Sequence, residues 1–178
     1  MACDITSGHA LGCRDNTGGI KALYILSGSV SSIAETSNEI SSVTGSGVFY
    51  QFDLVRGTSD FTETINGSTE NQTVFYEATI NASFAKMQTS LRNQIKVLAQ
   101  NPDLKIVVET NNNETGAKYF YVGRENGAQL NAGQGQSGTA LGDANNYTLT
   151  FTAQETSPAD VITGTDLESV LSGITVSQ

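Results

Sequence analysis

The sequence contains one glycine pattern that binds nucleotides in other settings. Gly133-Gln-Gly135-Gln-Ser-Gly138 has the spacing GxGxxG. In a dinucleotide-binding fold this pattern follows a strand and opens a helix, whose N-terminus meets the pyrophosphate. Here Gly142 and Asn145-Asn146 come next, followed by a strand-like segment. Because no helix is indicated after the glycines, we expect no nucleotide cofactor.

A metal centre or a hydrolytic triad would need histidine, and the chain has only His9. Cys3 and Cys13 flank it, but their spacing matches no common zinc finger and a fourth ligand is missing. One histidine in a probable N-terminal arm also makes a poor general base for a Ser–His–Asp triad. We therefore expect neither a metal nor a nucleophilic active site.

The remaining candidates for acid–base chemistry are paired carboxylates, of which Asp60 with Glu63 is an example. In a chain with 18 acidic and 9 basic residues, such pairs are more typical of a solvated or subunit-facing surface. We therefore expect that the protein is not an enzyme.

The charge of the chain bears on its contact with nucleic acid. The formal net charge is −9, and no Lys or Arg follows Arg124. Proteins bind duplex DNA through basic groups that displace its counterions. An acidic chain of this kind is expected to repel a polyanion and not to wrap it.

No part of the sequence indicates export or a membrane span. Met1–Asp4 lacks the basic start and the apolar run of a signal peptide, and no apolar stretch reaches the length of about 18 residues that marks a spanning helix. Five N-x-S/T sequons occur, at Asn66, Asn71, Asn81, Asn113 and Asn146. Sequons matter only in a secretory context. We expect synthesis in a cytosol, where thiols usually stay reduced, which disfavours a Cys3–Cys13 disulfide without deciding the redox state of the two cysteines.

The dominant element of the sequence is a long two-stranded ribbon. Its strands are Val48–Ile65 and Gln72–Ile80, rich in Thr, Phe, Tyr and Val, and Asn66-Gly67 between them is a strong turn signal. Arg56-Gly57-Thr58 predicts a bend inside the first strand. The far end of the ribbon is polar on both faces, and an isolated hairpin is marginally stable in water. Something must cover it.

A helix is predicted at 83–100, directly after the ribbon. Its apolar stripe has three- and four-residue spacing and consists of Phe84, Met87, Leu91, Ile95 and Leu98. Asn81 or Ser83 would cap the start, and Asn101-Pro102 would end it. The other face carries the bases Lys86, Arg92 and Lys96. This basic face is either solvated or in contact with an acidic surface of another subunit.

Further strands are predicted by period-two alternation. They are Gly19–Ser27, a hairpin of Leu104–Thr110 with Lys118–Gly123, and Tyr147–Ala153. The polar segment 28–47 is either a short strand or a loop, and 127–142 is predicted as a Gly/Gln-rich loop. Beyond residue 153, Thr165–Glu168 has capping-box spacing and Gly173 would end a short helix.

These elements predict a mainly β fold, a sandwich or barrel with one helix packed across it and a long extended hairpin. The expected organisation is an N-terminal arm over 1–18, a β domain over 19–158 and a C-terminal tail over 159–178.

The closing strand carries a resemblance to a known family. Asp143-Ala-Asn-Asn-Tyr147-Thr-Leu-Thr-Phe-Thr152, followed by Glu155 and Pro158, resembles the last strand of tail-tube (major tail) proteins of tailed phages. Ala2-Cys3-Asp4-Ile5-Thr6 with Gly18-Gly19-Ile20-Lys21 resembles the start of such virion proteins. The order of strand, long hairpin, helix, hairpin and strand is also similar.

The resemblance implies a virion structural protein that acts by assembly, without catalytic residues or a cofactor. Tail-tube proteins, which are similar to the tubes of contractile injection systems, form hexameric rings that stack into a hollow tube. Their strands join into an inner β-barrel through which DNA passes unbound, and a long hairpin and the termini bridge subunits. Other tail and neck proteins would be partners, and the host cytoplasm would be the place of assembly. The residues expected at subunit interfaces are Ile5, Leu11, Arg56, Phe61, Thr62, Thr64, Ile65, Val74 and Phe75.

Two alternatives remain open from the sequence. One is another tail or neck component, such as a tail-completion protein. The other is a carbohydrate-binding adhesin of the β-sandwich type, which would need secretion and exposed aromatic or acidic clusters. The absence of tryptophan and of a signal-peptide pattern weighs against it.

Overall fold

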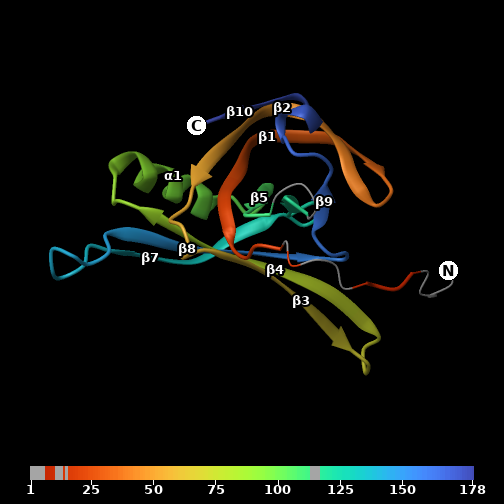
Figure 1. Cartoon of the computed structure of the whole chain (residues 1–178), viewed down its shortest axis with the longest axis horizontal. Helices are drawn as coiled ribbons and strands as arrows, with labels where there is room; N and C mark the ends of the chain where they lie inside the picture. Colours follow the sequence, from red (N-terminus) through yellow and green to blue (C-terminus); the bar gives the residue numbers. More distant parts are fainter. Residues whose placement is uncertain (1–6, 11–13, 15, 113–116) are drawn as a thin grey trace.

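The computed structural model describes residues 7–10, 14, 16–112 and 117–178. Within them the chain forms two β-sheets, one α-helix and one short 3₁₀-helix (Figure 1). The prediction of a mainly β fold with a single helix is confirmed.

The first two strands form one long curved hairpin. β1 (Ile20–Thr36) pairs antiparallel with β2 (Glu39–Asp53) along almost its whole length. The turn residues Ser37 and Asn38 both have positive φ, 58° and 65°, which suits the twist of a tight hairpin. The polar segment 28–47 therefore forms the outer half of this hairpin. Val48–Asp53, predicted as part of the ribbon, belongs to β2 and pairs with β1.

The six-stranded sheet closes on itself as a small barrel. Its order is β1, β5 (Ile106–Thr110), β6 (Tyr119–Val122), β9 (Asp160–Ile162), β2 and β10 (Leu171–Ser177), and the β1–β2 pairing completes the circuit. The predicted hairpin of β5 with β6 is confirmed.

The segment predicted as a C-terminal tail is part of this sheet. β9 pairs with β6, the 3₁₀-helix η1 (Glu168–Val170) follows, and β10 runs parallel to β2. The prediction of a tail was wrong because Ile162, Leu167 and Ile174 each lie several residues apart in a polar sequence, yet all three are buried. Single apolar residues at such wide spacing give no periodic pattern in the sequence that would predict a strand.

The four-stranded sheet has the order β3 (Asp60–Ser68), β4 (Thr73–Ala85), β8 (Asn146–Glu155) and β7 (Ala128–Gln136). β3 and β4 form the expected hairpin, but the predicted turn was wrong. Asn66 and Gly67 lie inside β3 opposite Phe75 and Val74, and the chain turns over residues 69–72. Register in a half-buried hairpin follows the apolar face, here the pair Phe61 and Ile80, which outweighs the local turn signal.

The predicted helix at 83–100 begins too early. β4 continues to Ala85, where Phe84 pairs with Tyr147 of β8 and is buried in the core. α1 spans Thr89–Gln100, and its N-cap residue Gln88 makes no side-chain capping bond, so Asn81 and Ser83 are not caps. Met87 precedes the helix and is exposed.

The rest of the predicted apolar stripe is confirmed, and so is the end of the helix. Leu91, Ile95 and Leu98 are half-buried and pack against the core. α1 ends at Gln100, with Asn101 as its C-cap. No residue of α1 is fully buried, so the helix lies on the body and does not penetrate it.

Two hydrophobic cores hold the layers together. One fills the barrel and includes Tyr24, Phe49 and Tyr121. The other lies between the barrel, the four-stranded sheet and α1, and includes Leu23, Ile80 and Phe151. β1 contributes to both cores from opposite faces, which explains why Gly19–Ser27 is apolar on nearly every residue.

Candidate assembly surface

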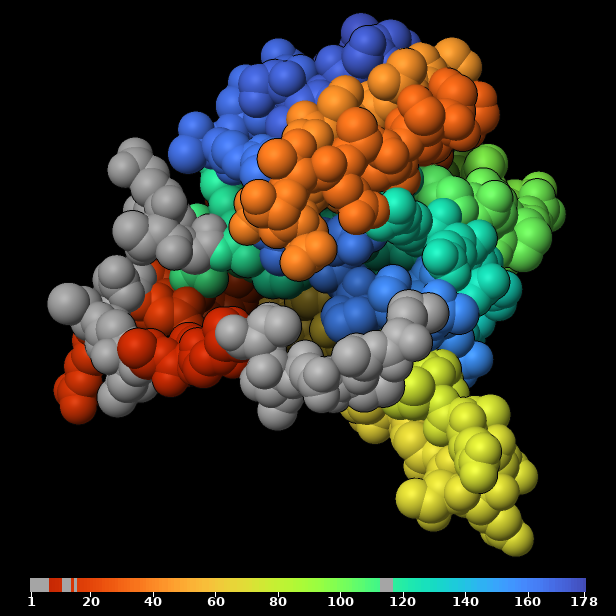
Figure 2. All heavy atoms as spheres, turned by 90° about the vertical axis from the view of Figure 1, so that its right-hand side faces the viewer, coloured from red at the N-terminus to blue at the C-terminus, as the bar shows by residue number. Residues whose placement is uncertain are grey.

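The β3–β4 hairpin extends beyond the body of the molecule. Figure 1 shows it projecting past β8, whose pairing with β4 ends at Tyr76, and Figure 2 shows its tip standing clear of the other elements. Phe61 and Ile80, at its base, face the core, where the Phe61 ring lies 5.3 Å from that of Phe120. On the same face but further out, Ile65 is 67% exposed and Val74 is 56% exposed. The apolar face thus continues into solvent without a cover from the described chain.

The interface residues predicted from the family resemblance lie as follows. Thr62, Thr64 and Phe75 are exposed on the opposite face of the hairpin from Ile65 and Val74. Arg56 is exposed in the turn between β2 and β3. Ile5 and Leu11 lie outside the described residues.

The face of the four-stranded sheet that points away from the core is polar. In β8 this face carries Thr148, Thr150 and Thr152, in strict alternation with the buried Leu149 and Phe151. Apart from Phe75 near the hairpin tip, the neighbouring strands continue it with polar residues, namely Asp60, Thr62, Thr64, Glu77, Thr79, Asn81, Gln129, Gln134 and Gln136. These positions include two acids and no base, so the face carries negative charge only.

Both edges of this sheet are open in the described part of the chain. β3 has a partner on one side only, and so has β7 after Ala128, whose backbone pairs with Leu104. Residues 127–142 were predicted as a loop, and this prediction was wrong because β7 occupies Ala128–Gln136. Gly133 faces Leu149 of β8 and Gly135 faces Tyr147 of β8. A β-carbon on either glycine would collide with the side chain that it faces. Glycine lets β7 pack against β8 at these positions. The alternation of Gln with Gly was the sequence signal that could have predicted this strand.

The GxGxxG pattern lies within this edge strand and the loop that follows it. No helix begins there, so the geometry that would hold a pyrophosphate is missing from this part of the chain. Among the described residues, no three Asp, Glu, His or Cys side chains are grouped so that they could hold a metal ion.

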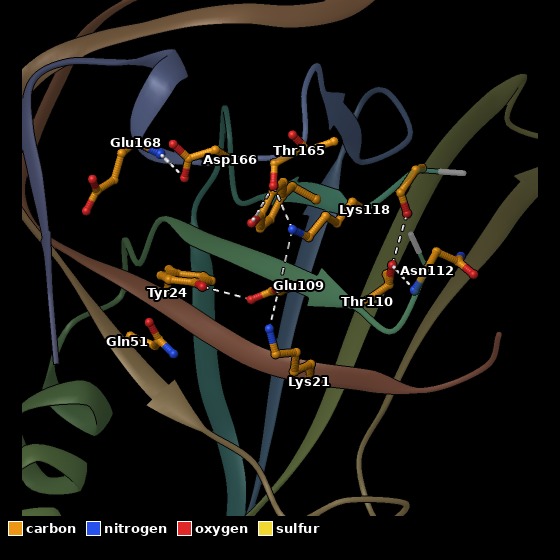
Figure 3. A network of polar contacts seen from close by, with 12 residues as sticks. Lys21, Tyr24, Gln51, Glu109, Thr110, Asn112, Lys118, Thr165, Asp166 and Glu168 are labelled. Carbon is orange, nitrogen blue, oxygen red and sulfur yellow. Dashed lines mark hydrogen bonds and ion pairs between the residues drawn. The ribbon is translucent and has the colours of Figure 1, made fainter. Parts of the chain in front are cut away.

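A buried carboxylate, Glu109, organises one end of the barrel (Figure 3). It accepts hydrogen bonds from the Tyr24 hydroxyl at 2.8 Å and from Lys21 Nζ at 3.0 Å, and Lys118 Nζ lies 3.7 Å away. Lys118 also donates to the backbone oxygen of Thr165 at 2.6 Å. The hydrogen bond and charge of Glu109 raise the pKa of Lys21, and burial raises the pKa of Tyr24. This network ties the C-terminal segment to β5 and β6, and its groups are fully engaged with one another.

A second acidic residue, Glu155, is held in place by hydrogen bonds from the backbone. Its carboxylate accepts hydrogen bonds from the backbone N–H groups of Glu125 and Asn126, which fixes the turn before β7. Burial raises the pKa of Glu155, against the opposing effect of those bonds. The adjacent cavity, lined by Tyr121 and Asp160 among others, measures about 10 Å³. It is far smaller than the several hundred Å³ of ordinary ligand pockets.

The open edges, the polar sheet face and the overhanging hairpin are the main surface features of this mainly β chain. The sequence matches no protein family model, and no curated protein or solved structure is significantly similar to it. No helix among the described residues has the length and apolar character needed to cross a membrane.

Proposed function

We propose that this chain is the subunit of a self-assembling tube of the phage-tail type, in which hexameric rings stack and enclose a channel for DNA. The observation that carries the proposal is the four-stranded sheet with two open edges. Pairing β3 of one copy with β7 of the next continues the sheet from subunit to subunit. It also satisfies the backbone N–H and C=O groups that a single copy leaves unpaired.

The contact between β3 and β7 joins two different surfaces, so it is head-to-tail. Contacts of this kind generate a ring when the rotation between copies closes, and a helical filament when it does not. Since the barrel and α1 occupy one face of the four-stranded sheet, a closed ring of these sheets has its polar face inward. The barrels then form the outer layer.

The polar face suits a channel for DNA. Apart from Phe75 near the hairpin tip, its side chains are mostly hydroxyls and amides, and its charged positions, Asp60 and Glu77, are acidic. Negative charge repels phosphates and offers no group that displaces DNA counterions. DNA therefore passes along such a wall without binding to it. The mechanism is assembly, with no covalent step.

Negative-stain electron microscopy and sedimentation of the purified full chain test the proposal. Rings or hollow tubes are expected, with a concentration-dependent transition from smaller species. A chain that stays strictly monomeric at high concentration contradicts the proposal.

A variant with a shortened hairpin tests whether the β3–β4 hairpin is needed for assembly. Deleting residues 62–73 removes all of β3 beyond Phe61, the turn and the first residue of β4, but leaves Phe61 and Ile80 in place. The variant is expected to keep the far-ultraviolet circular dichroism spectrum of a β protein but to form no rings or tubes. Tubes of normal appearance from this variant count against the role of the hairpin.

A further inference from the structure

The charges of two consecutive segments are sharply separated. Residues 57–85 contain four acids and no base, whereas residues 86–101 contain three bases and no acid. The acids are Asp60, Glu63, Glu70 and Glu77, and the bases are Lys86, Arg92 and Lys96. None of these seven groups takes part in a salt bridge within the described residues. Each segment therefore presents charge of one sign that its own copy does not neutralise.

The exposed large apolar side chains follow the same division. Three lie on the outer part of the acidic hairpin, Ile65, Val74 and Phe75. Three lie on or beside the basic segment, Tyr50, Met87 and Val97. Among the described residues only Leu141 is a large exposed apolar side chain elsewhere. Both segments thus combine uncovered apolar groups with unpaired charge, and the two charges are opposite.

The surface at α1 has a shape that can receive a ribbon. A groove of about 190 Å³ lies between α1, the end of β2 and residues 101–105, and Tyr50, Phe52 and Val97 line it. Val97 is 60% exposed at its margin. Arg92 and Lys96 are exposed and four residues apart, so they form a basic row along α1. We call Tyr50, Arg92, Lys96 and Val97 the helix surface.

One copy cannot cover its own helix surface with its own hairpin. In Figure 1 α1 lies at the left and the tip of the β3–β4 hairpin at the lower right, on opposite sides of the body. The match of charge and apolar surface therefore requires a second copy.

We infer that the outer part of the β3–β4 hairpin of one copy docks on the helix surface of another copy. Ile65 and Val74 cover the apolar groove, and Glu70, at the tip of the hairpin, reaches across α1 to Arg92 and Lys96. The inference rests on the proposed function, to which it adds a second contact besides edge pairing. It also resolves the two readings of the basic face in favour of an intersubunit contact.

Two charge-reversal variants test this contact. The helix variant is Arg92→Glu with Lys96→Glu, and the hairpin variant is Glu70→Lys with Asn71→Lys, both at exposed positions. Like charges then oppose each other across the contact, which disfavours association. Each variant alone is expected to need at least about tenfold more protein than the parent for half-assembly, measured by sedimentation. An equimolar mixture is expected to co-assemble, because the reversed helix of one variant attracts the reversed hairpin of the other.

A matched control reverses charges away from both surfaces. Glu39→Lys with Glu168→Lys changes two exposed acids at the β1–β2 turn and in η1 and should assemble like the parent. If the parent assembles and both test variants assemble equally well, the docking inference is overturned while the proposed function stands. Two defective variants that fail to co-assemble, although both are folded, also overturn it. A monomeric parent overturns the proposed function and the docking with it.

Discussion

The hydroxyl of Tyr24 donates a 2.8 Å hydrogen bond to the carboxylate of Glu109, which is almost fully buried between β1 and β6. The same carboxylate is the acceptor for Lys21 and the nearest anion to Lys118. Glu109 therefore accepts hydrogen bonds from Tyr24 and Lys21 and forms an ion pair with Lys118, so it holds strands β1, β5 and β6 together by polar contacts.

Replacing Glu109 by Gln should destabilise the fold. The amide keeps the shape of the side chain but removes the charge that strengthens its hydrogen bonds, and Lys118 loses a buried partner. Hydrogen bonds to charged groups contribute about 1.5–3 kcal/mol, so a loss of about 1–3 kcal/mol in the free energy of unfolding is expected by urea titration. Tyr24→Phe, which keeps the charge and removes only the tyrosine's hydrogen bond to it, should lose about 1.5–3 kcal/mol. Equal stability of E109Q and the parent would show that the charge is unimportant.

Stability should fall at alkaline pH. Burial raises the pKa of the Tyr24 and Tyr121 hydroxyls, and the hydrogen bond with Glu109 raises the pKa of Lys21. The folded state holds these protons more tightly than the unfolded state. Their contribution to the free energy of unfolding is therefore complete below about pH 10, near the ordinary pKa of tyrosine and lysine side chains. It is lost as the pH rises through the folded pKa values.

Urea titrations between neutral pH and pH 11 measure this effect. The free energy of unfolding should decline above about pH 10, and Tyr24→Phe should decline less steeply. A steeper decline in Y24F than in the parent would contradict the role assigned to Tyr24.

The sequence predicted individual strands better than their partners. Alternation located β8 and the β5–β6 hairpin because each strand shows its buried face over consecutive residues. It could not assign Val48–Asp53 to β1, because a strand's pattern records which face is buried and not which edge is paired. The helix began late for a related reason: Phe84 satisfies both the period-two pattern of β4 and the spacing of a helix with Leu91, and only pairing with β8 decides between them.

The candidate surface was predictable in part. The outer hairpin stood out because its far end was interpreted as polar on both faces, with little core of its own to bury. The structure shows that Ile65, Val74 and Phe75 are also exposed there. The second open edge did not, because Gly133 and Gly135 of β7 are a loop signal unless Leu149 and Tyr147 are known to face them. Whether an edge is open is a property of the whole sheet, so no local pattern reports it.

The pair Gly28 and Gly47 should be intolerant of side chains. They face each other across β1 and β2 with φ of +153° and +127°, and a β-carbon on Gly47 would lie 2.2 Å from the Ser27 backbone oxygen. Gly47→Ala adds both a backbone collision and a disfavoured φ, so a loss of about 2–4 kcal/mol is expected on thermal unfolding.

Gly67 provides the matched control within another strand. A β-carbon there meets nothing within 4 Å, and its φ lies outside the positive range. Gly67→Ala should be neutral or stabilise the chain by up to about 1 kcal/mol. Similar melting temperatures for G47A and G67A would mean that the close approach of β1 and β2 is relaxed in solution.

Ile80 and Ile65 lie on the same face of one hairpin, yet they should respond to truncation in opposite ways. Ile80 is fully buried beneath the body, whereas Ile65 is 67% exposed on the overhang. Ile80→Ala removes packed core volume and should lower the free energy of unfolding by about 2–5 kcal/mol. Ile65→Ala should change it by less than about 0.5 kcal/mol, because the side chain has little to lose in a single copy.

If Ile65 is covered by a second copy, however, I65A should raise the protein concentration needed for half-assembly, while a folded I80A chain should still assemble once enough of it is native. Sedimentation and urea titration of both variants measure the two effects separately. A large loss of stability in I65A, with unchanged assembly, would show that the overhang packs within its own subunit.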